Sequence, residues 1–254
     1  VLNKKKLVVN YLTWSEVFGI KKDNSLKNID FIIMAGGKGV RLSPFTKVLP
    51  KPLLPIDEKP VIEHIIEKFT NRGGKNFNIT VNYKSLLLKS YFKELKPNYK
   101  VRFFEEKKPM GTVGGLSFHK KKLKKNDIFL CNCDVIINAD LSEIYKFHLD
   151  KKNDFTIVAS TKSYEIPYGI CHINKSGKLI KIEEKPKSKF FANTGLYIFK
   201  PKILNLIPKN SFFHMTQLIE LAKKKKFKVG ICPITDNDWV DIGQLTNYSK
   251  YIRL

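Results

Sequence analysis

Arginine is scarce in this sequence, although the chain is strongly basic. Only Arg41, Arg72, Arg102 and Arg253 are arginines among 47 basic side chains, and 23 acidic residues leave a net charge of +24. The lysines are spread along the whole chain, and aromatic residues are not interleaved with the basic clusters. Nucleic-acid binders instead gather their basic residues on one face or in a known motif. We therefore expect no nucleic-acid partner, but a lysine-rich surface that attracts anionic substrates to a cleft.

Long apolar runs and paired cysteines are also missing. No stretch approaches the roughly 20 apolar residues that span a bilayer. The first residues show no signal-peptide pattern, so we expect no membrane partner and a cytoplasmic location. Cys131, Cys133, Cys171 and Cys232 form no CxxC pair and no zinc-spaced cluster with histidine. Three of them lie in apolar, strand-like runs, which predicts buried and reduced thiols.

From Asp30 onward, the chain alternates between strand-like and helix-like segments. Apolar runs predict strands, and 3.6-residue spacing predicts helices. The expected strands are 31–35, 77–81, 101–104, 128–133, 155–160, 169–173, 179–183, 194–199 and 228–231, and the expected helices are 61–69, 85–95, 141–150, 215–224, one starting at 112 and one from 244. This rhythm predicts an α/β fold of the Rossmann-like type, a doubly wound, mostly parallel sheet covered on both faces.

Residues 1–29 differ in character from the rest of the chain. They hold short β-like runs and a polar stretch, too little chain to form a core alone. We therefore expect residues 1–29 to be the remnant of an upstream domain with its linker, and residues 30–254 to be the catalytic domain.

A glycine-rich loop follows the first expected strand. Gly36, Gly37 and Gly39 allow backbone N–H groups to approach phosphates closely, at the strand end where open α/β sheets bind ligands. The loop matches neither the Walker pattern nor the dinucleotide GxGxxG pattern. Arg41 and Lys51 add two cations, and Lys51 is held between two prolines. The segment therefore predicts a cradle for the phosphates of a nucleotide.

This segment resembles the signature of the sugar-phosphate nucleotidylyltransferases, GGxGxRLxPxTxxxPKPxxPI. The matching residues are Gly36, Gly37, Gly39, Arg41, Leu42, Pro44, Thr46, Pro50, Lys51, Pro52, Pro55 and Ile56. The resemblance covers residues 30 to about 250 and implies the nucleotide-diphospho-sugar transferase fold. It also implies an Mg²⁺-dependent reaction in which an NTP and a sugar 1-phosphate give an NDP-sugar and pyrophosphate. Ala35 and the three glycines would then contact the nucleotide, while Arg41, Lys51 and Lys185 would be the catalytic cations.

Two aspartates match the Mg²⁺ ligands that the resemblance implies. Asp134 ends an apolar strand, a position that suits a hard cation with oxygen ligands. Asp241 lies in Trp-Val-Asp-Ile-Gly, which is similar to the W-x-D-x-G motif of the family. The nearby Asp140 and Asp238 are better explained as a helix cap and a turn residue.

Further motifs resemble the substrate-binding segments of the family. Gly111 and Thr112 lie in a segment like P-L-G-T-A-G, which closes over the nucleobase, and Asn82 falls where the family contacts the base edge. Glu184 and Lys185 belong to an E-K-P motif, in which they would bind sugar hydroxyls and the sugar phosphate. The other expected sugar-binding residues are Gly169, Asn193 and Thr194. For Gly169, Asn193 and Thr194 the competing explanation is plain turn or strand-end chemistry, and for Gly111 and Thr112 it is an ordinary helix N-terminus.

The resemblance leaves the substrates open. The Pro-x-Gly-Thr-x-Gly segment favours the guanylyltransferase branch and hence GTP, while glucosamine, mannose and heptose 1-phosphates all remain candidates for surface-glycan synthesis. The stretch around Leu12, Thr13 and Trp14 resembles the end of a CBS domain. A homodimer is an expectation from the family. Three alternatives remain: a cytidylyltransferase for a phosphorylated alcohol, a non-catalytic nucleotide-sensing subunit, and a nucleic-acid binder that rests on charge alone.

Overall fold

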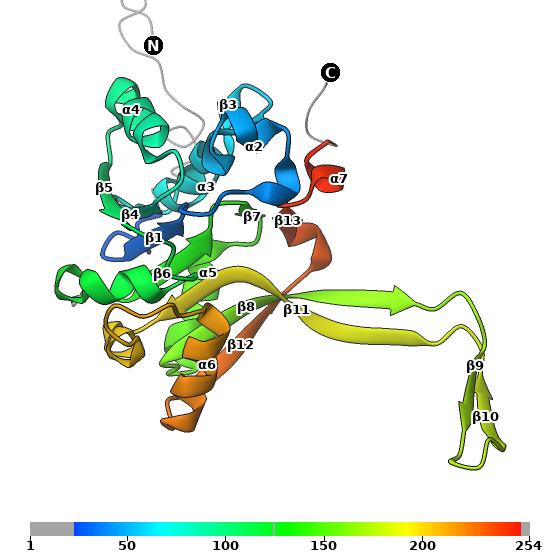
Figure 1. The fold of residues 1–254 in the computed structure, drawn as a ribbon. Coiled ribbons are helices and arrows are strands. Elements are labelled where there is room, and N and C mark those ends of the chain that lie inside the picture. The colour runs from blue at the N-terminus through cyan, green and yellow to red at the C-terminus, as the bar shows by residue number, and fades with distance from the viewer. Residues whose placement is uncertain (1–22, 124, 250–254) are drawn as a thin grey trace, which may run out of the picture.

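A seven-stranded sheet forms the centre of the computed structural model, which describes residues 23–123 and 125–249 (Figure 1). Its strand order is β12-β8-β11-β6-β1-β4-β5. The strands are β1 (Asp30–Met34), β4 (Asn76–Val81), β5 (Lys100–Glu105), β6 (Ile128–Asn132), β8 (Phe155–Glu165), β11 (Lys187–Phe199) and β12 (Val229–Ile234). Every neighbouring pair is parallel except the two that β11 makes with β6 and β8. The prediction of a mostly parallel α/β sheet is confirmed, and the reversed β11 is an addition to it.

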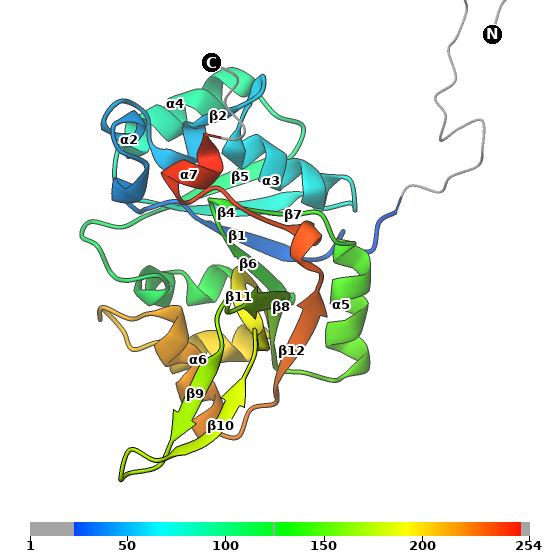
Figure 2. The ribbon, with the colours of Figure 1, turned by 90° about the vertical axis from the view of Figure 1, so that its right-hand side faces the viewer.

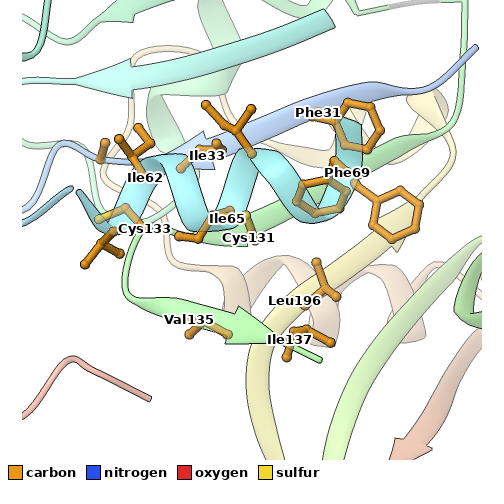
Figure 3. Close-up of a cluster of buried hydrophobic side chains, with 14 of the residues drawn as sticks. Phe31, Ile33, Ile62, Ile65, Phe69, Cys131, Cys133, Val135, Ile137 and Leu196 are labelled. Carbon is orange, nitrogen blue, oxygen red and sulfur yellow. The ribbon is translucent and has the colours of Figure 1, made fainter. Parts of the chain in front are cut away.

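Hydrophobic residues pack on both faces of this sheet. Along β1, Phe31 and Ile33 join one buried cluster and Ile32 joins the other, as the alternation of side chains along a strand requires. The first cluster is covered by α3 (Val61–Thr70), α4 (Ser85–Leu95) and α5 (Leu141–Asp150), and the second by α6 (Met215–Lys224). Figure 3 shows side chains of α3 pointing onto β1 and β6 in the first cluster. The doubly wound arrangement is therefore present.

The four longest helices, α3, α4, α5 and α6, form where the sequence predicts them. In α3 the buried residues are Val61, Ile62, Ile65, Ile66 and Phe69, the spacing of a helix with one apolar face. Helix α5 begins after Asp140, whose carboxylate accepts a hydrogen bond from the Ser142 N–H at 2.8 Å. The interpretation of Asp140 as a helix cap is thus confirmed. The helix expected to start at residue 112 is wrong in type, because that stretch forms only a short 3-10 helix, Gly114–Phe118.

Small elements complete the domain and bring distant segments together. The other helices are α2 (Phe45–Val48) and α7 (Leu245–Tyr248), and the small strand pairs are β2 (Pro55–Ile56) with β3 (Lys59–Pro60) and β7 (Val135–Ile137) with β13 (Trp239–Asp241). The β7–β13 pair is antiparallel and sets Asp241 opposite Val135. A segment near the end of the chain is thereby held beside the end of β6.

Two strands continue far beyond the sheet. Residues 161–165 of β8 pair with residues 187–191 of β11, and β9 (Ile170–Ile173) pairs with β10 (Leu179–Glu183) at the far end. Figure 1 shows this extension, residues 161–191, projecting from the body, and in Figure 2 it faces the viewer. We call it the arm. None of its residues is buried.

The start of the described chain packs onto the body. Leu26 and Ile29 are buried in the first cluster, and the Leu26 N–H donates to the Arg72 carbonyl oxygen at 3.0 Å. The stretch that resembles a CBS domain lies outside the described residues. Of the helices in the part of the chain that the structure describes, none is long and apolar enough to cross a bilayer.

Candidate active site

A cavity of about 350 Å³ opens at the carboxyl ends of β1 and β6. This is the edge at which open α/β sheets bind ligands. The residues around it include Gly36, Gly37, Gly39, Lys51, Glu106, Met110, Gly111, Thr112, Asn132 and Asp134. Six of the predicted nucleotide-site and catalytic residues, together with the predicted metal ligand Asp134, therefore surround one cavity.

The glycine loop leaves its backbone open to this cavity. A Cβ placed on Gly37 would meet no atom within 4 Å. Gly39 has a φ of +65°, and a Cβ there would lie 2.8 Å from the Thr46 methyl group, so only glycine fits. The Thr46 hydroxyl donates to the Gly39 carbonyl oxygen at 2.9 Å and holds the loop closed. Ala35 is buried at the root of the loop, where its N–H donates to the Thr80 carbonyl oxygen.

Lys51, Asp134 and Asp241 converge on Gly243. Lys51 is only 9% exposed, and its ammonium group pairs with the Asp134 carboxylate. A Cβ placed on Gly243 would overlap Asp134 Oδ2 and would lie 2.9 Å from Asp241 Oδ1 and 3.1 Å from Lys51 Nζ. The Gly243 N–H donates to Asp241 Oδ1 at 2.8 Å and orients that carboxylate. A cation and two carboxylates from three separate segments thus meet at one point.

The donor set at this point fits Mg²⁺. Magnesium is typically bound through one or two carboxylates, with water and substrate phosphates filling the other positions. Asp134 and Asp241 supply two such carboxylates beside the phosphate cradle. Among the described residues, no group of three His, Cys, Asp or Glu side chains forms an all-protein metal cage.

Two other predicted residues, Arg41 and Asn82, are not among the residues that line the cavity. Arg41 is exposed on the 3-10 helix Val40–Leu42, directly after Gly39, and its catalytic role stays a prediction. Asn82 follows β4, and its amide donates to the Glu106 carbonyl oxygen at 2.6 Å. The Asn82 side chain therefore fixes the chain at Glu106, next to the cavity.

Glu106 is a site residue that no sequence motif predicts. Its carboxylate lines the cavity, and Oε1 is buried without a hydrogen-bond partner. Burial raises the pKa of Glu106, and a hydrogen bond from the Met110 backbone only partly opposes this. A Cβ placed on Gly115 would overlap this carboxylate, so Gly115 makes room for it. The available signal was an acidic residue directly after β5, at the sheet edge that binds ligands.

The predicted sugar-binding residues are divided between two places. Asn193 donates to Tyr197 Oη at 2.8 Å, and the buried Thr194 hydroxyl donates to the Val158 carbonyl oxygen at 2.8 Å. The adjoining Gly195 packs against Asn132, which lines the cavity, so this segment borders the site. The polar groups of Asn193 and Thr194 are engaged within the sheet, and their contact with sugar stays a prediction.

Gly169, Glu184 and Lys185 lie on the arm. A Cβ placed on Gly169 would be 2.8 Å from Glu184 Oε2, so these residues cluster with one another. All three are exposed, and none lines the cavity. Within one chain, the structure does not bring them together with Lys51 and the two aspartates.

Several known proteins are similar to this chain in sequence or in fold. Mannose-1-phosphate guanyltransferase from Pichia angusta is 34% identical over 224 residues, which are 84% of this chain and 60% of that protein. D-glycero-alpha-D-manno-heptose 1-phosphate guanylyltransferase from Campylobacter jejuni is 31% identical over 224 residues, 87% of this chain and 97% of that protein. The crystal structure of HddC from Yersinia pseudotuberculosis superposes with a TM-score of 0.66 at 26% identity, covering 87% of this chain and 97% of HddC.

The family profile described as "Nucleotidyl transferase" matches residues 31–253, nearly the whole described domain. This match includes the glycine loop, both aspartates and the arm. The chain therefore belongs to the nucleotidyl transferase family.

Proposed function

We propose that this protein transfers a guanylyl group from GTP to a sugar 1-phosphate, with Mg²⁺, and releases pyrophosphate. The observation that carries the proposal is the convergence of Lys51, Asp134 and Asp241 beside an open glycine loop. The named relatives support the reaction class, since those from Pichia angusta and Campylobacter jejuni are guanylyltransferases for mannose and heptose 1-phosphates. Four free cysteines, three of them buried, fit a reducing and hence cytoplasmic location.

The proposed chemistry needs no general base. An oxygen of the sugar 1-phosphate is already anionic, and it attacks the α-phosphorus in line while pyrophosphate leaves. Catalysis then depends on positioning and on neutralising charge. Backbone N–H groups of Gly36 and Gly37 would hold the phosphates, and Lys51 would neutralise the charge that develops on them. Lys185 would bind the phosphate of the incoming sugar.

The metal would be held by Asp134 and Asp241. Mg²⁺ bound there would supply Lewis-acid stabilisation of the α-phosphate charge. The Lys51 ammonium pairs with the buried Asp134 carboxylate and holds it in position.

Glu106 supports guanine as the base. Guanine presents neighbouring N–H donors on its Watson–Crick edge, and the two oxygens of a carboxylate can accept hydrogen bonds from such donors. Glu106 Oε1 is buried and free of other partners beside the cavity. HddC from Yersinia pseudotuberculosis, similar in fold, has been solved in complex with GMP-PN.

The test is pyrophosphate release with Mg²⁺, in which the common NTPs and dTTP are crossed against a panel of sugar 1-phosphates and phosphocholine. We expect release with GTP and one mannose-type or heptose-type phosphate. Lys51→Ala should lower kcat about 10²–10³-fold, because a transition-state charge contact is lost. Lys47→Ala removes an exposed lysine on α2 and should retain wild-type activity.

Three outcomes would contradict the proposal. Wild-type turnover by Lys51→Ala would remove that catalytic role, and turnover with phosphocholine alone would favour the cytidylyltransferase. No release with any pair by folded protein would favour a nucleotide-sensing subunit. Glu106→Gln keeps the shape but replaces one acceptor with a donor. It should lower kcat/KM for GTP by about 10–100-fold, and an unchanged preference among the NTPs would exclude Glu106 from base recognition.

A further inference from the structure

The arm exposes large apolar side chains that the body would normally bury. Tyr168 is 73% exposed, Ile180 68%, and Ile182 and Phe191 are each more than half exposed. They lie on a two-stranded ribbon and on the hairpin at its end, without a covering helix layer (Figures 1 and 2). Several large apolar side chains left exposed on one element are typical of a surface that contacts another molecule.

The same arm carries half of the proposed site. Gly169, Glu184 and Lys185 are the residues assigned to the sugar and its phosphate, and they are absent from the cavity that holds Lys51 and Asp134. The cavity of a single chain therefore has a nucleotide side but lacks the arm's contribution to the sugar side.

The hydrogen bonds of the arm keep it away from the cavity of its own chain. The β8–β11 ladder runs without interruption from Asn193 opposite Ala159 to Lys187 opposite Glu165. At the root of the arm, Lys162 pairs with Asp236 and lies 5.0 Å from the Trp239 ring centroid. To fold back onto its own cavity, the arm would have to break these root contacts and bend the ladder. A second molecule can meet it without such losses.

We propose that two copies of this chain exchange arms, so that the arm of each lies across the cavity of the other and delivers Glu184 and Lys185 to it. The sugar-side roles of these residues rest on the proposed function, whereas the contact itself does not. A two-fold arrangement makes the exchange reciprocal, since each copy both gives and receives an arm. The contact buries the apolar side chains of the arm and completes two sites at once.

Sedimentation of the purified chain tests the contact independently of activity, with and without GTP and Mg²⁺. We expect a dimer for the wild type and a monomer for Ile180→Asp, which places a charge in the buried contact. Ile231→Asp is the matched control, because Ile231 is 48% exposed on β12, outside the arm, and it should remain dimeric. A wild type that is monomeric at tens of micromolar in both conditions overturns the proposal.

Mixed variants test the delivery of Lys185. Lys51→Ala lacks a working cavity but keeps an intact arm, and Lys185→Ala has the reverse defect. Co-expressed with different tags, they should form mixed dimers with one complete site in two, giving about a quarter of wild-type activity at random pairing. No recovery above the two separate variants overturns exchange in favour of an arm that serves its own chain. Full activity of Lys185→Ala alone overturns the delivery of Lys185, because the site would then not need this side chain.

The two proposals fail differently. A wild type that releases no pyrophosphate with any substrate pair contradicts the proposed function, while sedimentation of the Ile180→Asp and Ile231→Asp variants still decides whether the arms are exchanged.

Discussion

The body and the arm share two strands, β8 and β11, yet large apolar side chains are buried in the body and exposed in the arm. In the body, Phe155, Val158 and Phe199 are fully buried beneath helices. In the arm, Phe190 and Phe191 on the continuation of β11 are more than half exposed. The strand pattern alone therefore does not bury a side chain, because burial also requires a second layer. Apolar side chains on a strand without such a layer are therefore available for contact with another molecule.

The largest expected effect is a difference in the free energy of unfolding between a variant in the body and a variant in the arm. Phe31→Ala removes a ring packed against Phe69 and Phe77 in the first cluster and should lower the free energy of unfolding by about 3–5 kcal/mol. Phe191→Ala on the arm should change it by less than about 0.5 kcal/mol in dilute, monomeric protein. Urea unfolding followed by circular dichroism measures both. Similar losses for the two variants would mean that the arm is packed within its own chain.

The next largest expected effect is a difference in activity between substitutions of two glycines, one in the body and one in the arm. Gly243→Ala places a methyl group among Asp134, Asp241 and Lys51, and the resulting displacement should lower kcat about 10²-fold. Gly177→Ala, at a φ of +81° on the arm with open space around it, should cost about 1 kcal/mol of local strain and little activity. Pyrophosphate release measures this difference, with thermal unfolding as a check on folding. Full activity of Gly243→Ala would show that the three side chains do not act as one site.

A smaller effect concerns pH. His148 is fully buried in α5, and burial lowers its pKa below the ordinary value of 6.5, with Lys200 adding to this and Asp127 and Asp154 opposing it. Below about pH 6.5 the unfolded chain therefore binds a proton that the folded chain does not. The free energy of unfolding should fall by up to about 1.4 kcal/mol per pH unit, until the folded histidine also titrates.

The matched variants for this pH effect lie in the two regions. His148→Gln should flatten the stability profile between about pH 7 and 5. His172→Gln, on the exposed β9 of the arm, should follow the wild type. Urea unfolding at several pH values provides the measurement, and equal profiles for wild type and His148→Gln would assign the acid sensitivity to other groups.

Much of the fold and half of the site could be predicted from local sequence. Helical spacing in Val61–Thr70 and apolar alternation in β1 follow directly from the periods of helix and strand. The glycine loop and Lys51 could be predicted as phosphate-binding groups because they lie in one continuous sequence motif. Glu106 was missed, because its importance comes from a buried, unpartnered oxygen rather than from a motif.

The sequence by itself determined the alternating α/β order, the phosphate loop and the pair of aspartates, since each depends on short-range spacing or on a continuous motif. Only the tertiary structure decided that Asp241 meets Asp134 across the β7–β13 pair, and that Glu184 and Lys185 stand apart on an arm. The physical reason is that strand pairing joins residues distant in the chain, and that burial depends on which layers cover a strand rather than on the strand's own residues.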